Sequence, residues 1–237
     1  MNESLQIIAP LNLAVAFIPV LIVLVILYKW SLNSANALYS VIRMLVQLLL
    51  VGYVLTTIFQ AESAWLVMGV MLVMVTAASW IALGTIKEKR TQLFRHGFWS
   101  ILCGGGVTLI LVTQGVINLD PWFEPQYMIP LAGMIFANSM NSVSLAAERL
   151  HAEIERDVPY EKARTIAFNA AFIPVVNSLF AVGLVALPGM MTGQILSGVS
   201  PIIAAHYQIV VMCMIFGSAG LSTAYFLVLT KSIFTQK

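Results

Sequence analysis

The chain has 237 residues, of which 60% are hydrophobic and only 9% are charged. Soluble domains carry roughly 25% charged residues on average. The 12 Lys and Arg and 10 Asp and Glu of this chain are too few to coat a soluble globule of this length. The composition therefore argues against a soluble enzyme.

Long uncharged runs predict an all-α polytopic membrane protein. A helix needs about 20 apolar residues to cross about 30 Å of hydrocarbon. Five of the runs between charged residues hold one crossing each, and the sixth, over 165–230, is long enough for two. We therefore expect one membrane domain over 1–237 with seven spans, near 9–28, 42–60, 64–84, 98–117, 127–147, 166–187 and 207–230.

The last two spans are separated by a segment rich in helix breakers. Pro188, Gly189, Gly193 and Pro201 all fall between 188 and 201, in the middle of the longest uncharged run. Irregular backbone at membrane depth is tolerated only where protein or water surrounds it. The sequence therefore predicts a re-entrant or surface segment over 188–206.

The distribution of Lys and Arg predicts the orientation, because basic residues in short loops stay cytoplasmic. With seven spans, all basic clusters fall on one side: Lys29 to Arg43, Lys87 to Arg95, Arg149 to Arg164, and Lys231 with Lys237. The other side receives Glu3, Glu62, the loop 120–124 and the segment 188–206, which carry no Lys or Arg. We expect the N-terminus outside and the C-terminus in the cytoplasm.

A few polar side chains lie within the predicted spans. Gln47 shares a helix face with Arg43, Asn138 and Asn141 cluster in the fifth span, and Asn177 follows Pro174 in the sixth. Polar groups in hydrocarbon are expected to face protein or a water-filled cavity. The amides could line a polar path or make hydrogen bonds between helices, whereas Arg43 is best explained by snorkelling to the cytoplasmic surface.

Small residues in two spans predict close helix packing. Gly104, Gly105 and Gly106 follow one another in the fourth span, and Gly217 and Gly220 lie in the seventh. The single cysteines Cys103 and Cys213 have no metal-site spacing, and we expect them to be small core residues. Since no Gly-rich loop followed by Lys and Ser or Thr is present, we expect no nucleotide or other cofactor on this chain.

The one sizeable charged segment is 148–165, which holds half of the acidic residues of the chain. Leu150 and Ile154 share one face, so its first half predicts an amphipathic helix. Asp157 and Pro159 predict a break before a second helix. The segment could dock a cytosolic partner or be a solvated loop helix, and Glu148, His151 and Glu155 have a spacing that a metal site could use.

Four stretches carry a resemblance to a known family. They are Val46–Leu55, Ile129–Ile135 with Asn138 and Met140, the block Leu187-Pro188-Gly189-Met190-Met191-Thr192-Gly193, and Tyr207–Val211 leading to Leu221-Ser222-Thr223. In these stretches the chain resembles the FetB family of ABC-transporter permeases, which includes iron exporters and a plant aluminium-tolerance permease. The Leu-Pro-Gly-Met-Met-Thr-Gly block is the most specific of the four.

The resemblance implies a permease subunit that exports iron or another metal and is not itself an enzyme. It implies a bacterial inner (plasma) membrane, a homodimer of permeases in the lipid bilayer, and a separate cytosolic ABC ATP-binding subunit that holds ATP and Mg, with no nucleic acid as partner. On this hypothesis the substrate path includes Gln47, Asn138, Asn141, Asn177, Met190 and Met191, and the surface that couples to the ATPase includes Glu148, Glu153, Glu155, Arg156, Glu161 and Arg164.

Two methionines and several alternatives stay open at this point. Met190 and Met191 could contact a soft cation, but Pro188 and Gly189 beside them favour a structural break or gate. The chain could also be an ABC permease for nucleotide sugar or another small solute, or a seven-helix channel or receptor that needs no ATPase. An intramembrane enzyme is disfavoured, because no Asp or Glu lies within a predicted span to form a carboxylate dyad.

Overall fold

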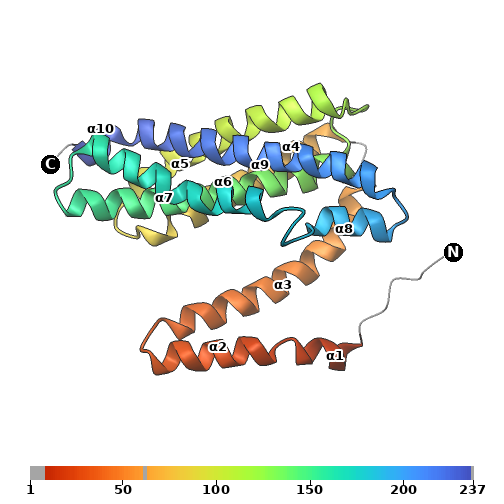
Figure 1. Ribbon diagram of the computed structural model, residues 1–237, viewed down its shortest axis with the longest axis horizontal. Coiled ribbons are helices and arrows are strands. Elements are labelled where there is room, and N and C mark those ends of the chain that lie inside the picture. Colours follow the sequence, from red (N-terminus) through yellow and green to blue (C-terminus); the bar gives the residue numbers. More distant parts are fainter. Residues whose placement is uncertain (1–8, 61–62, 236–237) are drawn as a thin grey trace. The chain divides into compact units, whose positions relative to one another are not determined.

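The structure is a computed structural model that describes residues 9–60 and 63–235. Within these ranges it consists of helices and turns and has no β-strand, which confirms the predicted all-α class. Three residues of the predicted charge pattern, Glu3, Glu62 and Lys237, lie outside the described ranges. The chain divides into two compact units, 1–60 and 61–237, which are coloured in chain order in Figure 1. The single membrane domain expected from the sequence stays a prediction.

Unit 1 contains α1 (Pro10–Val15), α2 (Ile18–Lys29) and α3 (Ser34–Ile58). A tight turn joins α2 to α3, with Ser31 at φ 55°. The Asn33 side chain accepts a hydrogen bond from the Asn36 backbone N–H at 3.0 Å, which explains why α3 starts at 34 and not near 42. Among the side chains described in this unit, Ile58 alone is buried.

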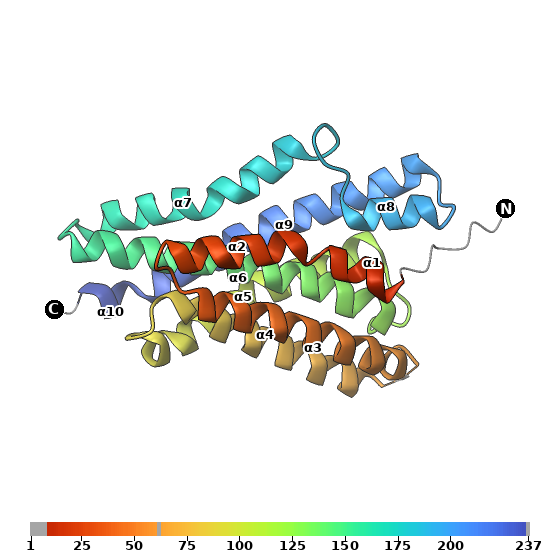
Figure 2. The ribbon, with the colours of Figure 1, turned by 90° about the horizontal axis from the view of Figure 1, so that it is seen from below.

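The described part of unit 2 contains five long helices, which pack side by side as a bundle (Figures 1 and 2). The long helices are α4 (Ala64–Ala82), α5 (Arg90–Ile110), α6 (Pro125–Glu155), α7 (Tyr160–Ala181) and α9 (Pro201–Leu229). The shorter elements are the 3-10 turn η1 (Leu83–Thr85), the π-helical turn η2 (Leu111–Val116), α8 (Gly189–Leu196) and α10 (Lys231–Thr235). Successive long helices run in opposite directions, and α6 packs against the other four.

Six helices in the described residues are long and apolar enough to cross a membrane: Asn12–Lys29, Ser34–Ile58, Ala64–Thr85, Arg90–Val116, Tyr160–Ala181 and Pro201–Leu229. The seventh predicted span, 127–147, lies within α6, whose Asn and Ser side chains lower its hydropathy. Its 31 residues nevertheless extend for about 46 Å, from the end of the bundle where η2 finishes to the end where α7 begins. We therefore count α6 as a crossing by its place in the bundle.

Small residues bring the helices of unit 2 into contact, as the sequence predicts. A Cβ on Gly104 would lie 2.5 Å from the Ser222 backbone nitrogen of α9, and a Cβ on Gly105 would lie 2.8 Å from Ile135 Cγ2 of α6. The buried Ser222 hydroxyl also donates to Ser139 Oγ at 3.1 Å. These contacts are typical of helix pairs in membranes, where close approach replaces the hydrophobic driving force.

The cysteine prediction is wrong. Cys103 and Cys213 are both exposed on the surface of unit 2, although each directly precedes a buried residue. A thiol behaves as a small hydrophobic group, so it can face hydrocarbon as readily as a protein core.

Two predicted boundaries also shift. The amphipathic helix expected after 148 is the continuation of α6, which ends at Glu155, and the break falls at 156–159 with Asp157 at φ 58°. Helix α7 ends at Ala181 and not near 187, because Val182 is extended and Gly183 takes φ 82°, a region that favours glycine. The segment after it forms the two-turn helix α8, and α9 starts at Pro201 and not near 207.

Candidate functional site

The Lys and Arg residues described in unit 2 gather at one end of the bundle, which we call the basic end. They lie in the α4–α5 connection, on both sides of the α6–α7 turn and at the start of α10: Lys87, Lys89, Arg90, Arg95, Arg149, Arg156, Lys162, Arg164 and Lys231. The opposite end carries Asp120 and Glu124 in the α5–α6 connection. The segregation of charge predicted from the sequence is thus present within unit 2.

Side-chain contacts tie the basic end together. Lys231 Nζ lies 2.6 Å from Glu161 Oε1 and so joins α10 to α7. The Lys89 ammonium lies 4.6 Å from the centre of the Phe234 ring, which links the α4–α5 connection to α10. The Tyr160 hydroxyl donates to the Leu227 carbonyl of α9. The first turn of α7 is therefore held on α9 and α10 by both a hydrogen bond and an ion pair.

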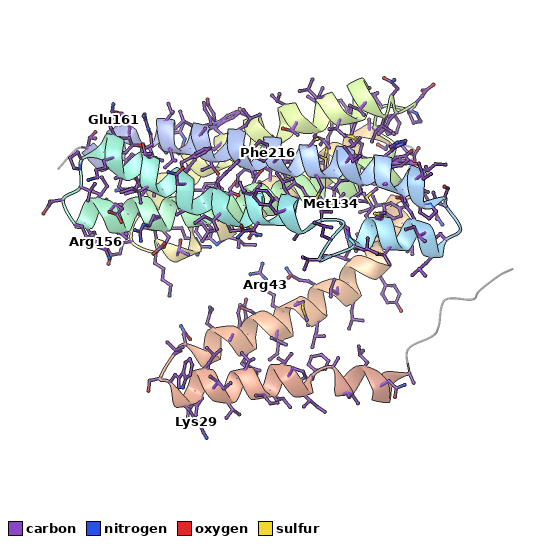
Figure 3. The ribbon with its side chains drawn as sticks, viewed as in Figure 1. Lys29, Arg43, Met134, Arg156, Glu161 and Phe216 are labelled. Atoms are coloured by element: carbon purple, nitrogen blue, oxygen red, sulfur yellow. The ribbon has the colours of Figure 1, made fainter. Side chains whose placement is uncertain are left out.

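A buried carboxylate holds the end of α6. The side chain of Glu153 is 6% exposed, and its Oε1 lies 2.8 Å from Arg149 Nη2 and 3.5 Å from Arg156 Nη1. Both arginines are themselves partly exposed, so the pair sits at the edge between protein interior and solvent. A buried carboxylate needs such partners, and Glu153 therefore fixes the last turn of α6, where the chain reverses. Figure 3 labels Arg156 at this turn.

The six predicted coupling residues occupy different environments at this end. Glu148, Glu155, Arg156 and Glu161 are exposed and Arg164 is half-buried, whereas Glu153 is buried. Glu161 pairs with Arg164 at 2.8 Å as well as with Lys231. His151 Nε2 lies 3.2 Å from Glu155 Oε1, but no group of three metal-ligating side chains occurs in the described part of the chain. The metal site that the spacing of Glu148, His151 and Glu155 left open is therefore not formed.

The predicted path residues of α6 and α7 lie at similar depths. Asn138 is 17 residues before Glu155, the end of α6, and Asn177 is 17 residues after Tyr160, the start of α7. Both amides therefore lie about 26 Å along their helices from the α6–α7 turn. Asn138 is half-buried and its Nδ2 donates to the Met134 carbonyl of its own helix at 2.8 Å.

The other amides lie on outer faces of their units. Asn141 is exposed on α6, and Asn177 is exposed on α7 four residues after exposed Ile173 and eight after exposed Asn169. Gln47 is exposed on α3 of unit 1. Met190 and Met191 are half-buried on α8, at the end of unit 2 opposite the basic end (Figure 1). That these residues form one path stays a prediction.

Several anchoring residues escape the sequence reasoning. The Arg90 guanidinium carbon lies 3.8 Å from the centre of the Trp80 ring, and Arg90 Nη2 donates to the Trp80 carbonyl at 2.6 Å. This contact explains why α5 starts eight residues before the predicted span. Glu153 lies three residues after buried Leu150, so helical spacing alone places it on the inner face.

Unit 2 is an all-α bundle of membrane-crossing length. Its Lys and Arg side chains lie at one end, and its amide side chains lie between apolar ones. These features define a polytopic integral membrane protein. The chain belongs to the family described as "Uncharacterised protein family (UPF0014)", which matches residues 10–234.

Three relatives extend this assignment. The chain is 36% identical over 233 residues to the "Probable iron export permease protein FetB" of Escherichia coli (strain K12), covering 90% of this chain and 86% of that protein. It is 33% identical over 228 residues to the protein ALUMINUM SENSITIVE 3 of Arabidopsis thaliana, covering 89% and 81%. It is 32% identical over 245 residues to the membrane protein YjkA of Bacillus subtilis (strain 168), covering 95% of each. No solved structure gives a significant match. The resemblance to the FetB family is confirmed.

Proposed function

We propose that this chain is the membrane-spanning permease subunit of an ABC transporter, that it exports iron or another metal across a bacterial inner membrane, and that ATP is hydrolysed on a separate cytosolic subunit. The observation that carries the proposal is the match along nine-tenths of the chain to a relative named as an iron export permease. Transport across a bilayer, and not chemistry on this chain, is the activity proposed.

The basic end of unit 2 is proposed to face the cytoplasm. Nine Lys and Arg residues lie there, while the described part of the opposite end carries only acidic charges. Lys and Arg in short connections are retained on the cytoplasmic side during insertion. ATP is available on that side, so a partner that hydrolyses it would meet this end.

The α6–α7 turn is proposed as the docking surface for the ATP-binding subunit. Exposed Glu148, Glu155 and Arg156 offer charges to a soluble partner, while buried Glu153 and the Tyr160 and Glu161 contacts hold the turn rigidly. A displacement of this turn by the bound partner would be transmitted to α6, which packs against every other long helix of unit 2. Such rigid connection is what coupling of a distant ATPase to a membrane path requires.

The amide-bearing faces of α6 and α7 are proposed to line the substrate path. Unpaired amides are costly against lipid, so exposed Asn141 and Asn177 are expected to face water or protein when the transporter is assembled. A second copy of the chain in a permease homodimer could supply such protein cover. Amide oxygens are suitable ligands for hard cations. The thioethers of Met190 and Met191 suit soft cations instead. We therefore assign the two methionines to a gate at the end of the path and not to a binding site for a hard cation.

The first test is complex formation. The chain is expressed with an ABC ATP-binding subunit from the same organism, and the two are purified together. We expect a stable complex that is lost in the double variant Glu148→Lys with Glu155→Lys, because two exposed charges beside the turn are reversed while both partners of Glu153 are kept. Asp120→Lys at the opposite end is the matched control and should keep the complex. Absence of any complex with the unchanged chain would contradict the proposal and favour an ATPase-independent channel.

The second test is transport. Vesicles that hold the complex should move iron(II) only when ATP is present, and Asn177→Leu should reduce this flux. Ile173→Leu, on the same face of α7 one turn away, is the control and should not reduce it. ATP-dependent movement of a nucleotide sugar but not of metal would keep the ABC permease and overturn its substrate.

A further inference from the structure

The three consecutive glycines of α5 do not have the same surroundings. Gly104 and Gly105 lie against α9 and α6, where an added Cβ would meet atoms at 2.5 and 2.8 Å. A Cβ on Gly106 would meet nothing within 4 Å, and the same holds for Gly69 on α4. Two glycines on neighbouring helices therefore face open space and are not used for helix packing.

Gly69 and Gly106 line the same cavity. The cavity has a volume of about 540 Å³ and lies between α4, α5, η2 and the first half of α6. Its inner wall is formed by buried Val75, Leu109, Met128 and Phe136, and its mouth by exposed side chains that include Trp65 and Trp122. The volume falls in the range of ligand sites, and it exceeds the voids that protein packing leaves empty.

The walls of the cavity are almost wholly apolar. Thr113 is the buried polar residue there, and its hydroxyl donates to the Leu109 carbonyl at 2.9 Å, so it offers no free donor. The remaining polar side chain, Gln114, lies at the end of the cavity near Trp122. A polar substrate would find no partners along this wall, whereas a hydrocarbon chain needs none.

The length of the cavity matches the thickness of the hydrocarbon region of one lipid leaflet. It extends along α4 from Trp65 to Val75, which is about 15 Å of helix, or half of a hydrocarbon core about 30 Å thick. Both helices that form most of it are candidate membrane spans. Trp65 and Trp122 mark its outer end, as Trp does at the level of lipid headgroups.

We propose that this cavity binds one acyl chain of a membrane lipid, from the leaflet at the end opposite the basic end. The acyl chain would lie along Gly69 and Gly106, and the end that joins the lipid headgroup would lie near Gln114 and Trp122. This inference depends on the membrane location of the protein but not on the proposed transport of metal. The amide faces of α6 and α7 take no part in it.

Photolabelling tests the proposal. The full chain is placed in vesicles of phosphatidylethanolamine and phosphatidylglycerol that contain phosphatidylethanolamine with a diazirine in one acyl chain. After illumination, labelled peptides are mapped by mass spectrometry. We expect labelling of 64–75, 102–114 and 122–136 well above that of α2, whose described side chains are not buried and which reports general contact with lipid.

Variants that fill the cavity distinguish a site from a lipid-facing surface. Gly106→Leu and Gly69→Leu each place a side chain in the open space from a different helix, and each should lower the labelling of these peptides to the level of α2 while the melting temperature is kept. Gly115→Leu, in η2, also meets nothing within 4 Å but does not line the cavity, and should leave the labelling unchanged.

Three outcomes would overturn the proposal. The cavity peptides of the unchanged chain could label no more than α2, labelling could persist in both Leu variants, or cross-linking could show these peptides covered by a protein segment from unit 1 or a second copy. None of these outcomes bears on the complex with an ATP-binding subunit, so this inference and the proposed function fail separately.

Discussion

Unit 1 and the α6 helix of unit 2 show opposite uses of an apolar sequence. Helix α2 is strongly hydrophobic and has no buried residue within its unit, whereas α6 carries Asn138, Asn141 and several serines and has buried side chains along most of its length. In a bilayer the surroundings are as apolar as leucine, so hydrophobicity alone does not drive helices together. The most apolar helices are thus those suited to lipid, and the less apolar helix is the one surrounded by protein.

The largest expected effect concerns orientation and is all-or-none. With Cys103 and Cys213 replaced by Ala, single cysteines at Ser31, in the α2–α3 turn of unit 1, and at Lys162, near the α6–α7 turn of unit 2, should react with a membrane-impermeant thiol reagent only from the cytoplasmic side. Ser197→Cys should react only from outside. Labelling of Ser31→Cys and Lys162→Cys from opposite sides would contradict the proposed seven-span topology.

The next effect separates packing in the two units. Gly104→Ala places a Cβ 2.5 Å from the backbone of α9, and we expect it to lower the free energy of unfolding by about 2 kcal/mol. Gly52→Ala in α3 meets nothing within 4 Å and should raise stability by about 0.5–1 kcal/mol, since alanine favours helix more than glycine does. Chemical denaturation in detergent measures both, and equal effects at the two sites would show that unit 2 is not closely packed there.

A smaller effect distinguishes buried from exposed charge at the basic end. Glu153→Ala leaves Arg149 and Arg156 without their carboxylate and removes the anchor of the last α6 turn, so we expect a loss of about 1–2 kcal/mol. Glu155→Ala, two residues later and exposed, should change stability little. The same denaturation measurement compares them. A larger loss for Glu155→Ala would mean that the turn is held in another way.

The smallest effect concerns a single hydrogen bond. Tyr160→Phe removes the donor to the Leu227 carbonyl of α9 and should lower stability by about 1 kcal/mol, while the helices keep their places. Tyr225→Phe, on the exposed side of α9, is the matched control and should have no such effect. Hydrogen exchange at the start of α7 should rise in the first variant only.

The sequence predicts the helices better than their ends or their partners. Uncharged runs mark each predicted span, because hydrocarbon excludes charge, but α3 begins nine residues before Arg43. Helices α5 and α6 also extend past those runs, where Arg90 binds Trp80 and Glu153 binds two arginines. Neighbouring glycines also differ in their surroundings, because Gly105 packs on Ile135 whereas Gly106 faces a cavity. Tertiary packing decides which helix lies opposite a given residue, and helical spacing along the sequence does not reveal that neighbour.

The most direct test of the central claim is ATP-dependent metal movement by the purified chain together with its ATP-binding subunit. Inside-out vesicles that hold both should accumulate iron(II) when ATP is supplied, and vesicles that hold the chain alone should not. We predict that accumulation stops in the double variant Glu148→Lys with Glu155→Lys and continues in Asp120→Lys. Equal iron flux with and without ATP and its binding subunit would contradict the account and identify the chain as a channel.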